Sequence, residues 1–261
     1  MQHLLDAILS LNRFDTLREQ VDAAQSLPPL GLNRAARLPV LAALCQAVEK
    51  PILFITQKTD HALALHDELN FWSPDIPRFY FPEPTSLFYE AAPWGSNTRR
   101  ERLNTLSTLV AGLIPGAQPP ANAPVVVVPA RALMSVTLPR RAFVKAARVV
   151  KPGQQINPVQ LAAQWVRAGY EPVGTVVVPG QFARRGGILD IWPEASIQPV
   201  RLDFFDDELE SLRLFDPASQ RSTSQIESLL IPPAREYILP PDASDDGESF
   251  TELHIPVFHP E

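Results

Sequence analysis

The amino-acid sequence predicts an α/β protein: a parallel-sheet layer, resembling a degenerate P-loop layer, followed by a smaller α+β module. Two observations carry this prediction. Short apolar runs alternate with helical stretches up to about residue 138, a pattern typical of strands buried in a parallel sheet. Beyond residue 170 only strand-like runs follow one another, at 173–178, 187–192, 200–205 and 208–215. Proline, at 28 of 261 residues, punctuates many segment ends, as expected of many short elements.

The first layer contains helices and strands in alternation. Apolar residues at helical spacing predict helices over 1–24, 31–49, 62–72 and 97–113. Continuous apolar runs predict strands over 51–56, 78–81 and 125–128. We expect the 51–56 and 125–128 strands to be buried on both faces.

The second module begins with a helix. Asn157 precedes Pro158, which is a favourable helix start, and Gly169 follows where a left-handed residue often ends a helix. Asp206-Asp207 lies between two strand-like runs, as expected of a hairpin turn. We therefore expect domains at 1–138 and 139–228, with 229–261 as the start of chain returning to the first domain.

Composition excludes several classes. Hydrophobic residues make up 45% and charged residues 20%, which is ordinary for a globular protein. No apolar run approaches the length of a membrane span, and no signal-peptide pattern opens the chain, so we expect a cytoplasmic protein without membrane partners. Cys45, the one cysteine, excludes an internal disulfide framework and is expected in the core.

The charge is divided between the two halves. Residues 1–150 hold 15 Lys and Arg against 12 Asp and Glu, whereas residues 151–261 hold 8 against 17. This balance does not indicate a strongly basic surface for duplex DNA.

Residues 31–38 (GLNRAARL) are the nearest match to a phosphate-binding loop. Such a loop needs G-x-x-x-x-G-K-[ST], yet only the first glycine, Gly31, is present. Ala36 replaces the second glycine, Arg37 the lysine and Leu38 the magnesium ligand. The segment is either a decayed nucleotide loop or a chance match, and in both cases we expect no ATP hydrolysis.

Other catalytic patterns are weak. Asp203, Asp206, Asp207, Glu208 and Glu210 are interpreted as a solvated hairpin tip, because alternation scatters them over two faces; an acidic metal site is the alternative. The sequence has no G-x-S-x-G nucleophile motif. We predict no metal and no cofactor.

Four linked motif blocks carry the strongest signal. They are Gly180 to Phe182, RGGILDIWP at 185–193, the 199–213 strand pair, and FDPASQRS at 215–222. Together they resemble the module shared by bacterial UvrB and the N-terminal region of the transcription-repair coupling factors (Mfd). Gln181 departs from the glutamate usual in that family. The resemblance covers about 28–238 and is most specific over 179–222.

Outside the module the chain is more similar to coupling factors than to UvrB. The stretch 78–106 resembles their corresponding segment, and there is no room between Tyr89 and Arg99 for the damage-clamping hairpin of UvrB. An intact phosphate loop is also absent, as in the coupling factors.

The resemblance implies that the module docks UvrA through residues equivalent to Arg185, Arg201 and Phe205, with Gly186 and Gly187 forming a turn or bulge that aims Arg185. Alternation independently places Arg201, Asp203 and Phe205 on one face of a strand. Arginine beside an exposed aromatic residue is typical of a protein–protein hot spot. The alternatives are a cross-strand ion pair of Arg201, for example with Glu210, and a satellite core around Phe205.

The resemblance therefore predicts a non-enzymatic binding module that recruits UvrA to stalled transcription during nucleotide excision repair. In a full-length parent, other domains would contact RNA polymerase and DNA. The alternatives are a UvrB-like ATP-dependent helicase that processes damaged DNA, and a free-standing competitor for UvrA. Only about 30 residues follow the module, so we expect the returning half of the first domain to be truncated.

Overall fold

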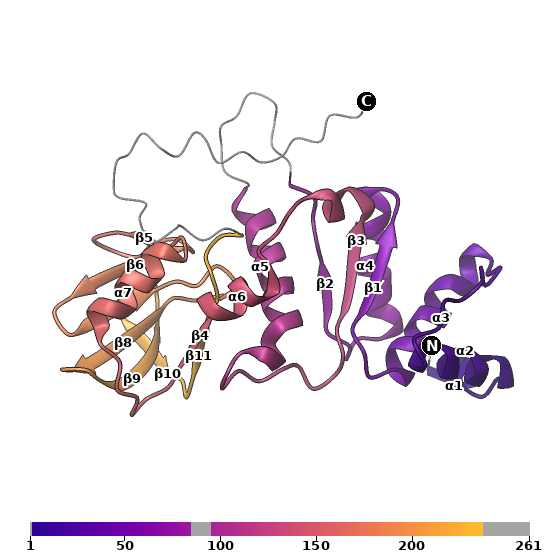
Figure 1. Cartoon of the computed structure of the whole chain (residues 1–261), viewed down its shortest axis with the longest axis horizontal. Coiled ribbons are helices and arrows are strands. Elements are labelled where there is room, and N and C mark those ends of the chain that lie inside the picture. The colour runs from indigo at the N-terminus through magenta and orange to yellow at the C-terminus, as the bar shows by residue number, and fades with distance from the viewer. Residues whose placement is uncertain (1, 85–94, 237–261) are drawn as a thin grey trace, which may run out of the picture.

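The structure is a computed structural model that describes residues 2–84 and 95–236. A helical N-terminal region, a parallel sheet and a mixed sheet follow one another along the longest axis, with helix α5 (Ser96–Val110) between the two sheets (Figure 1). Most of the 89–99 segment and the tail 237–261, including His254 and His259, lie outside the described residues. Within the described part, no helix has the length and apolar character needed to span a bilayer.

The N-terminal region folds as helices α1 (Gln2–Leu9), α2 (Asn12–Asp22) and α3 (Arg34–Ala47). The single helix expected over 1–24 is therefore two, interrupted at residues 10 and 11. Leu5 of α1 is fully buried in one cluster with Leu41 and Cys45 of α3. This confirms that Cys45 is a core residue, and its burial raises the thiol pKa to about 12.

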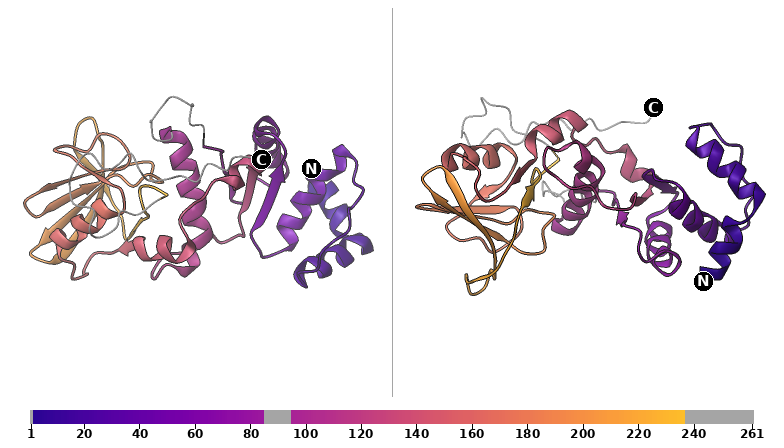
Figure 2. Two further views of the ribbon diagram at one scale, coloured as in Figure 1. Left: turned by 45° about the horizontal axis from the view of Figure 1, so that its top comes forward. Right: turned by 90° about the horizontal axis from the view of Figure 1, so that it is seen from below.

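The parallel sheet has the order β1 (Ile52–Thr56), β3 (Val125–Pro129), β2 (Arg78–Tyr80). Helix α4 (Thr59–Trp72) packs with α3 on one face, and α5 lies beside β2 on the other (Figure 2). The central strand β3 is buried throughout, as predicted. The same prediction for β1 is wrong: Leu53 and Ile55 are 50% and 53% exposed, because β1 is an edge strand and α5 covers the β2 side.

A short 3-10 turn, η1 (Ala111–Leu113), follows α5 and precedes β3. A second 3-10 turn, η2 (Ala130–Met134), and the short helix α6 (Arg140–Ala146) lead from β3 to the second module. The α/β class is thus confirmed, with one parallel and one mixed sheet.

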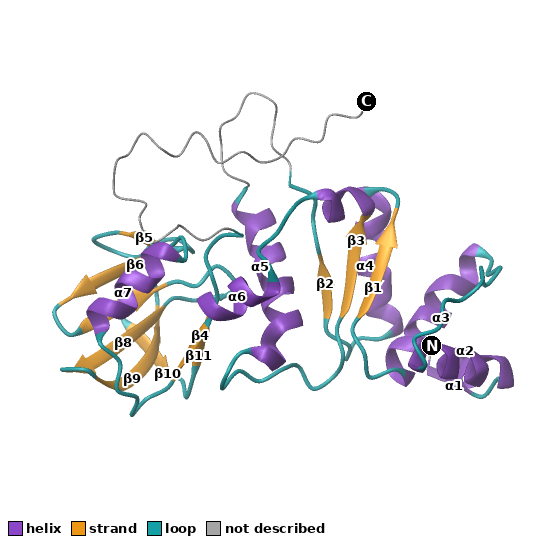
Figure 3. Ribbon diagram, in the orientation of Figure 1, coloured by secondary structure: helices purple, strands orange, loops and turns teal. Residues whose placement is uncertain are grey.

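The second module is a mixed sheet with one covering helix (Figure 3). Its strands lie in the order β10 (Ser222–Gln225), β9 (Glu208–Phe215), β8 (Val200–Phe205), β7 (Ile188–Ile191), β6 (Gln181–Arg185), β5 (Glu171–Pro172). Beside this sheet, β4 (Arg148–Val150) pairs antiparallel with β11 (Leu229–Ile231).

Helix α7 (Pro158–Arg167) covers one face of the mixed sheet. The predicted N-cap is confirmed, since the Asn157 side chain accepts hydrogen bonds from the backbone N–H groups of Val159 and Gln160, both at 3.1 Å. Trp165 packs edge-on against Phe182, with ring centroids 5.5 Å apart. The core of the module lies between these two layers.

The strand predicted over 173–178 is wrong, because β5 ends at Pro172. Val176 instead packs against Ala183 and Phe215 on the sheet face opposite α7. The backbone N–H groups of Val177 and Val178 donate to Oε1 of Gln181. The Gln181 side chain thus accepts the backbone hydrogen bonds that a neighbouring strand would otherwise accept.

Candidate protein-docking site

The hairpin of β6 and β7 presents Arg185 at a two-residue turn. Arg185 pairs with Ile188, so Gly186 and Gly187 form the loop, and Gly186 has a left-handed φ of +59°. At Gly187 a Cβ atom would lie 2.7 Å from the carbonyl oxygen of Phe204 on the neighbouring strand. The glycine pair therefore permits both the turn and the close approach to β8.

The hairpin of β8 and β9 presents Phe205 in a similar way. Asp206 and Asp207 form its loop, with Asp206 at φ +50°. Along β8 the residues alternate as predicted: Val200, Leu202 and Phe204 are buried in the core, while Arg201, Asp203 and Phe205 face the other side. The Phe205 side chain is 68% exposed, which excludes the satellite-core alternative.

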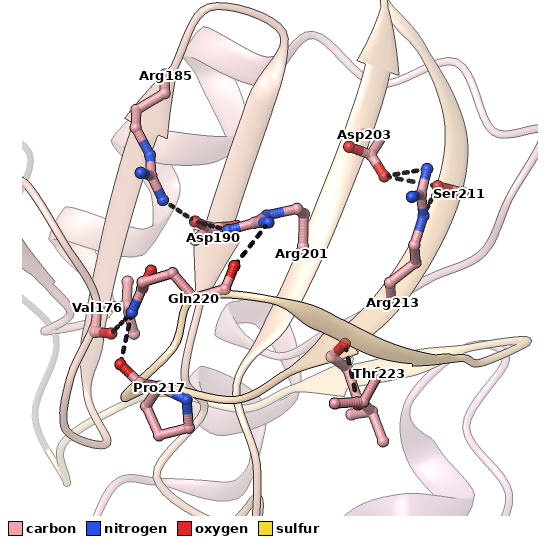
Figure 4. A network of polar contacts seen from close by, with 11 residues as sticks. Val176, Arg185, Asp190, Arg201, Asp203, Ser211, Arg213, Pro217, Gln220 and Thr223 are labelled. Carbon is pink, nitrogen blue, oxygen red and sulfur yellow. Dashed lines mark hydrogen bonds and ion pairs between the residues drawn. The ribbon is translucent and has the colours of Figure 1, made fainter.

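Arg185 and Arg201 converge on one carboxylate, that of Asp190 in β7 (Figure 4). Nε and Nη2 of Arg201 donate to Asp190 Oδ1 and Oδ2 at 2.7 and 2.9 Å, and Nη2 of Arg185 donates to Oδ2 at 2.5 Å. The Asp190 side chain is fully buried, the Arg201 side chain is 16% exposed and that of Arg185 is 46% exposed. These hydrogen bonds to Asp190 raise the pKa of Arg201, and burial opposes them.

The ion pair considered for Arg201 therefore exists with a different partner. Asp190 lies directly opposite Arg201 in the register of β7 and β8, whereas Arg213 occupies the opposing position on β9. Glu210, the partner suggested by the sequence, is exposed at a bulge.

A second polar cluster lies on the same face (Figure 4). Asp203 accepts from Ser211 at 2.7 Å and pairs with Arg213 at 3.0 Å. Asp206, Asp207, Glu208 and Glu210 are exposed, as predicted for a hairpin tip. Over the residues that the structure describes, no group of three or more potential metal ligands comes together.

The loop at 31–38 is built as a helix start. Gly31 has φ +62°, and the Asn33 side chain caps α3 by accepting from the Ala36 backbone N–H at 2.9 Å. Leu38 is buried in the core, and Arg37 is exposed, with Nε donating to the Leu32 carbonyl. In the described residues before this loop, α2 and irregular chain take the place of the strand that a phosphate loop follows.

The second module thus combines a mixed sheet covered by α7 on one face with a charged, partly exposed opposite face. Residues 149–237 match the family model of the UvrB interaction domain. The chain is 34% identical to the transcription-repair-coupling factor of Bacillus subtilis over 81% of its length, and 32% identical to that of Escherichia coli over 79%. It is 32% identical to that of Myxococcus xanthus over 90% of its length.

The chain is therefore a homologue of the transcription-repair-coupling factors and contains a UvrB interaction domain. It spans 17% to 20% of the length of these three relatives.

Sequence reasoning did not single out Asp190 or Gln220, although both lie inside the quoted motif blocks. Asp190 lies within the apolar run ILDI, which indicates that its carboxylate is buried. Because a buried carboxylate needs a cationic partner, this position was the available signal for an ion pair. No comparable signal marks Gln220, whose role depends on a left-handed backbone.

Proposed function

We propose that the 139–228 module binds UvrA and recruits it to stalled transcription during nucleotide excision repair in the bacterial cytoplasm. The contact surface comprises Arg185, Arg201 and Phe205, with Gly186 and Gly187 shaping the turn. The observation that carries this proposal is the exposed Phe205 on the same sheet face as the Arg185–Asp190–Arg201 cluster, opposite the core. An exposed aromatic residue and a preorganised arginine on one face match the composition of interface hot spots.

The test is UvrA binding by isothermal calorimetry, using the whole chain. Phe205→Ala and Arg185→Ala should each weaken binding about 30-fold or more, as expected for central anchors. Arg213→Ala is a matched control, because Arg213 is 49% exposed on the same face but pairs with Asp203. A native chain that does not bind UvrA contradicts the proposal, as does an Arg213→Ala variant that loses as much affinity as Arg185→Ala.

For the first region we propose a degenerate nucleotide fold, related to the first domain of UvrB, that does not turn over ATP. The Ala36 amide, which a phosphate loop would direct at its ligand, already donates to Asn33, and the Leu38 position lacks a hydroxyl. ATP turnover by the purified chain would favour the helicase alternative instead.

The proposed division of the chain is 1–138, 139–228 and 229–261. The third part begins with β11, which pairs with β4 of the second module. RNA polymerase and DNA are proposed as partners of a longer parent protein, through domains outside this chain.

A further inference from the structure

The cluster around Asp190 is asymmetric in charge and exposure. Two guanidinium groups share one carboxylate, which leaves one surplus positive charge. Arg201 donates two hydrogen bonds to the Asp190 carboxylate, and its side chain is mostly buried. Arg185 donates to the same carboxylate through one nitrogen, and its side chain is nearly half exposed. The surplus charge is therefore presented to solvent at Arg185.

The carboxylate is also what keeps the two arginines together. Two guanidinium groups brought this close repel each other, and this repulsion is weakly screened where the groups are partly buried. Asp190 is completely buried between them and accepts three charge-assisted hydrogen bonds. Removing its charge therefore releases Arg185 into solvent and leaves Arg201 without its main partner.

A second support comes from the turn at 216–220. Gln220 adopts a left-handed φ of +59°, and its backbone carbonyl accepts from Nη1 of Arg201 at 3.3 Å. Its side-chain Nε2 donates to the carbonyls of Val176 and Pro217, at 3.1 and 2.7 Å. The turn is closed by Asp216, whose side chain accepts from the Ser219 N–H at 2.7 Å.

Arg201 is thus enclosed on several sides. Its guanidinium also lies over the ring of Phe215, 4.9 Å from the centroid. Residues from RGGILDI, from the β8 strand and from FDPASQ therefore meet at one side chain, so the motif blocks of the sequence form one structural unit.

We propose that Asp190 and Gln220 are positioning residues that fix Arg185 and Arg201 in the arrangement that UvrA recognises. This inference rests on the proposed function. A partner that meets prearranged side chains does not have to order them on binding, so the arrangement contributes to affinity without Asp190 touching the partner.

The first test is Asp190→Asn in the whole chain, which keeps the shape and removes the charge. UvrA affinity should fall about tenfold or more, as expected when charge-assisted hydrogen bonds that order a contact residue are lost. Asp203→Asn is the matched control, because it removes the neighbouring carboxylate–arginine pair on the same face, and it should change affinity less than about threefold.

Two further readouts separate positioning from a general loss of structure. The Nε–H signal of Arg201 in nuclear magnetic resonance spectra should be resolved and protected in the native chain and in Asp203→Asn, and lost in Asp190→Asn. In an Arg185→Ala background, Asp190→Asn should cost clearly less affinity than in the native chain, because one of the two residues it positions is gone.

Gln220→Gly keeps the test decisive if Asp190→Asn does not fold. Glycine retains the left-handed backbone and the carbonyl but removes the side-chain ties to Val176 and Pro217. It should weaken UvrA binding about threefold or more, with a native circular dichroism spectrum.

Unchanged affinity in folded Asp190→Asn or Gln220→Gly, while Arg185→Ala still weakens binding, would overturn the positioning roles and leave the proposed function intact. A native chain that shows the protected Arg201 signal but does not bind UvrA would instead remove the proposed function.

Discussion

Glu194 of the second module accepts a hydrogen bond from Nε of Arg99 in α5 at 2.6 Å. The two residues are 95 positions apart, and their side chains are 3% and 17% exposed. A parallel bidentate contact joins Arg102 of α5 to Glu236, at 2.5 and 2.9 Å. Helix α5 thus contacts both the parallel sheet and the second module, and its two ion pairs join these parts of the chain.

Breaking the first contact should destabilise the chain. Arg99→Ala leaves the Glu194 carboxylate buried without its nearest cation, and we expect a loss of about 2–4 kcal/mol in the free energy of unfolding. The control is Arg131→Ala, since Arg131 is 80% exposed and pairs with Glu83 at 3.5 Å, so its removal should cost less than about 0.5 kcal/mol. Urea unfolding followed by circular dichroism measures both, and equal losses would show that the contact with α5 contributes little.

The same carboxylate predicts a pH dependence. Burial raises the pKa of Glu194 above its ordinary value of 4.5, although Arg99 opposes the shift. Between pH 4.5 and the raised value, the folded state therefore binds more protons than the unfolded state, so the contribution of Glu194 to stability falls as pH rises. Relative to Glu194→Gln, the native chain should lose stability from pH 4.5 upward. Urea midpoints of both proteins across this range test the sign, and a difference that increases with pH in favour of the native chain contradicts it.

The exposed side of β8 was predictable from local sequence, but the partner of Arg201 was not. Strict alternation in 200–205 assigns Arg201 and Phe205 to one face whatever the neighbouring strands are. The partner depends on which strands are adjacent and in what register. The sequence suggested the following strand and Glu210, whereas the carboxylate comes from the preceding strand, and a bulge after Asp203 shifts the register toward β9.

The predictions for two apolar runs are wrong in part, because tertiary contacts decide whether a run forms a strand and how deeply it is buried. The run at 173–178 is rich in valine, which favours strands, yet Val176 fills a small cluster on the outer face and Gln181 takes the neighbouring amide hydrogens. The 51–56 run does form a strand, but its position at the sheet edge leaves Leu53 and Ile55 half exposed. Neither outcome is encoded in the periodicity of the run itself.

Tyr170 should make a measurable contribution to the module. Its hydroxyl donates to the Pro232 carbonyl at 2.7 Å in a buried setting, so Tyr170→Phe leaves that carbonyl unpaired and should cost about 1–3 kcal/mol. Burial also raises the pKa of Tyr170 well above 10. Spectrophotometric titration should show one tyrosine that ionises only when the protein unfolds in alkali, and this signal should be missing in Tyr170→Phe. A Tyr170→Phe variant with unchanged stability would contradict this assignment.

The two glycines of the Arg185 turn should respond differently to alanine. At Gly186 no atom lies within 4 Å of an added Cβ, so Gly186→Ala meets only the left-handed backbone penalty of about 1 kcal/mol. At Gly187 the added Cβ meets the Phe204 carbonyl oxygen at 2.7 Å, where the N–H of Phe204 also donates to the Gly187 carbonyl at 2.8 Å. Because both partners are backbone, the hairpin must move away from β8, and we expect a loss of about 2–3 kcal/mol.

This movement also separates the turn that carries Arg185 from the strand end that carries Phe205. Gly187→Ala should therefore weaken UvrA binding more than Gly186→Ala does. The difference in affinity should persist well below the unfolding temperature of both variants, where neither protein is unfolded. Urea unfolding and calorimetric binding of the two proteins provide the comparison. If Gly186→Ala is the more damaging change in stability, the close contact with Phe204 does not determine the position of the turn, and the left-handed backbone does.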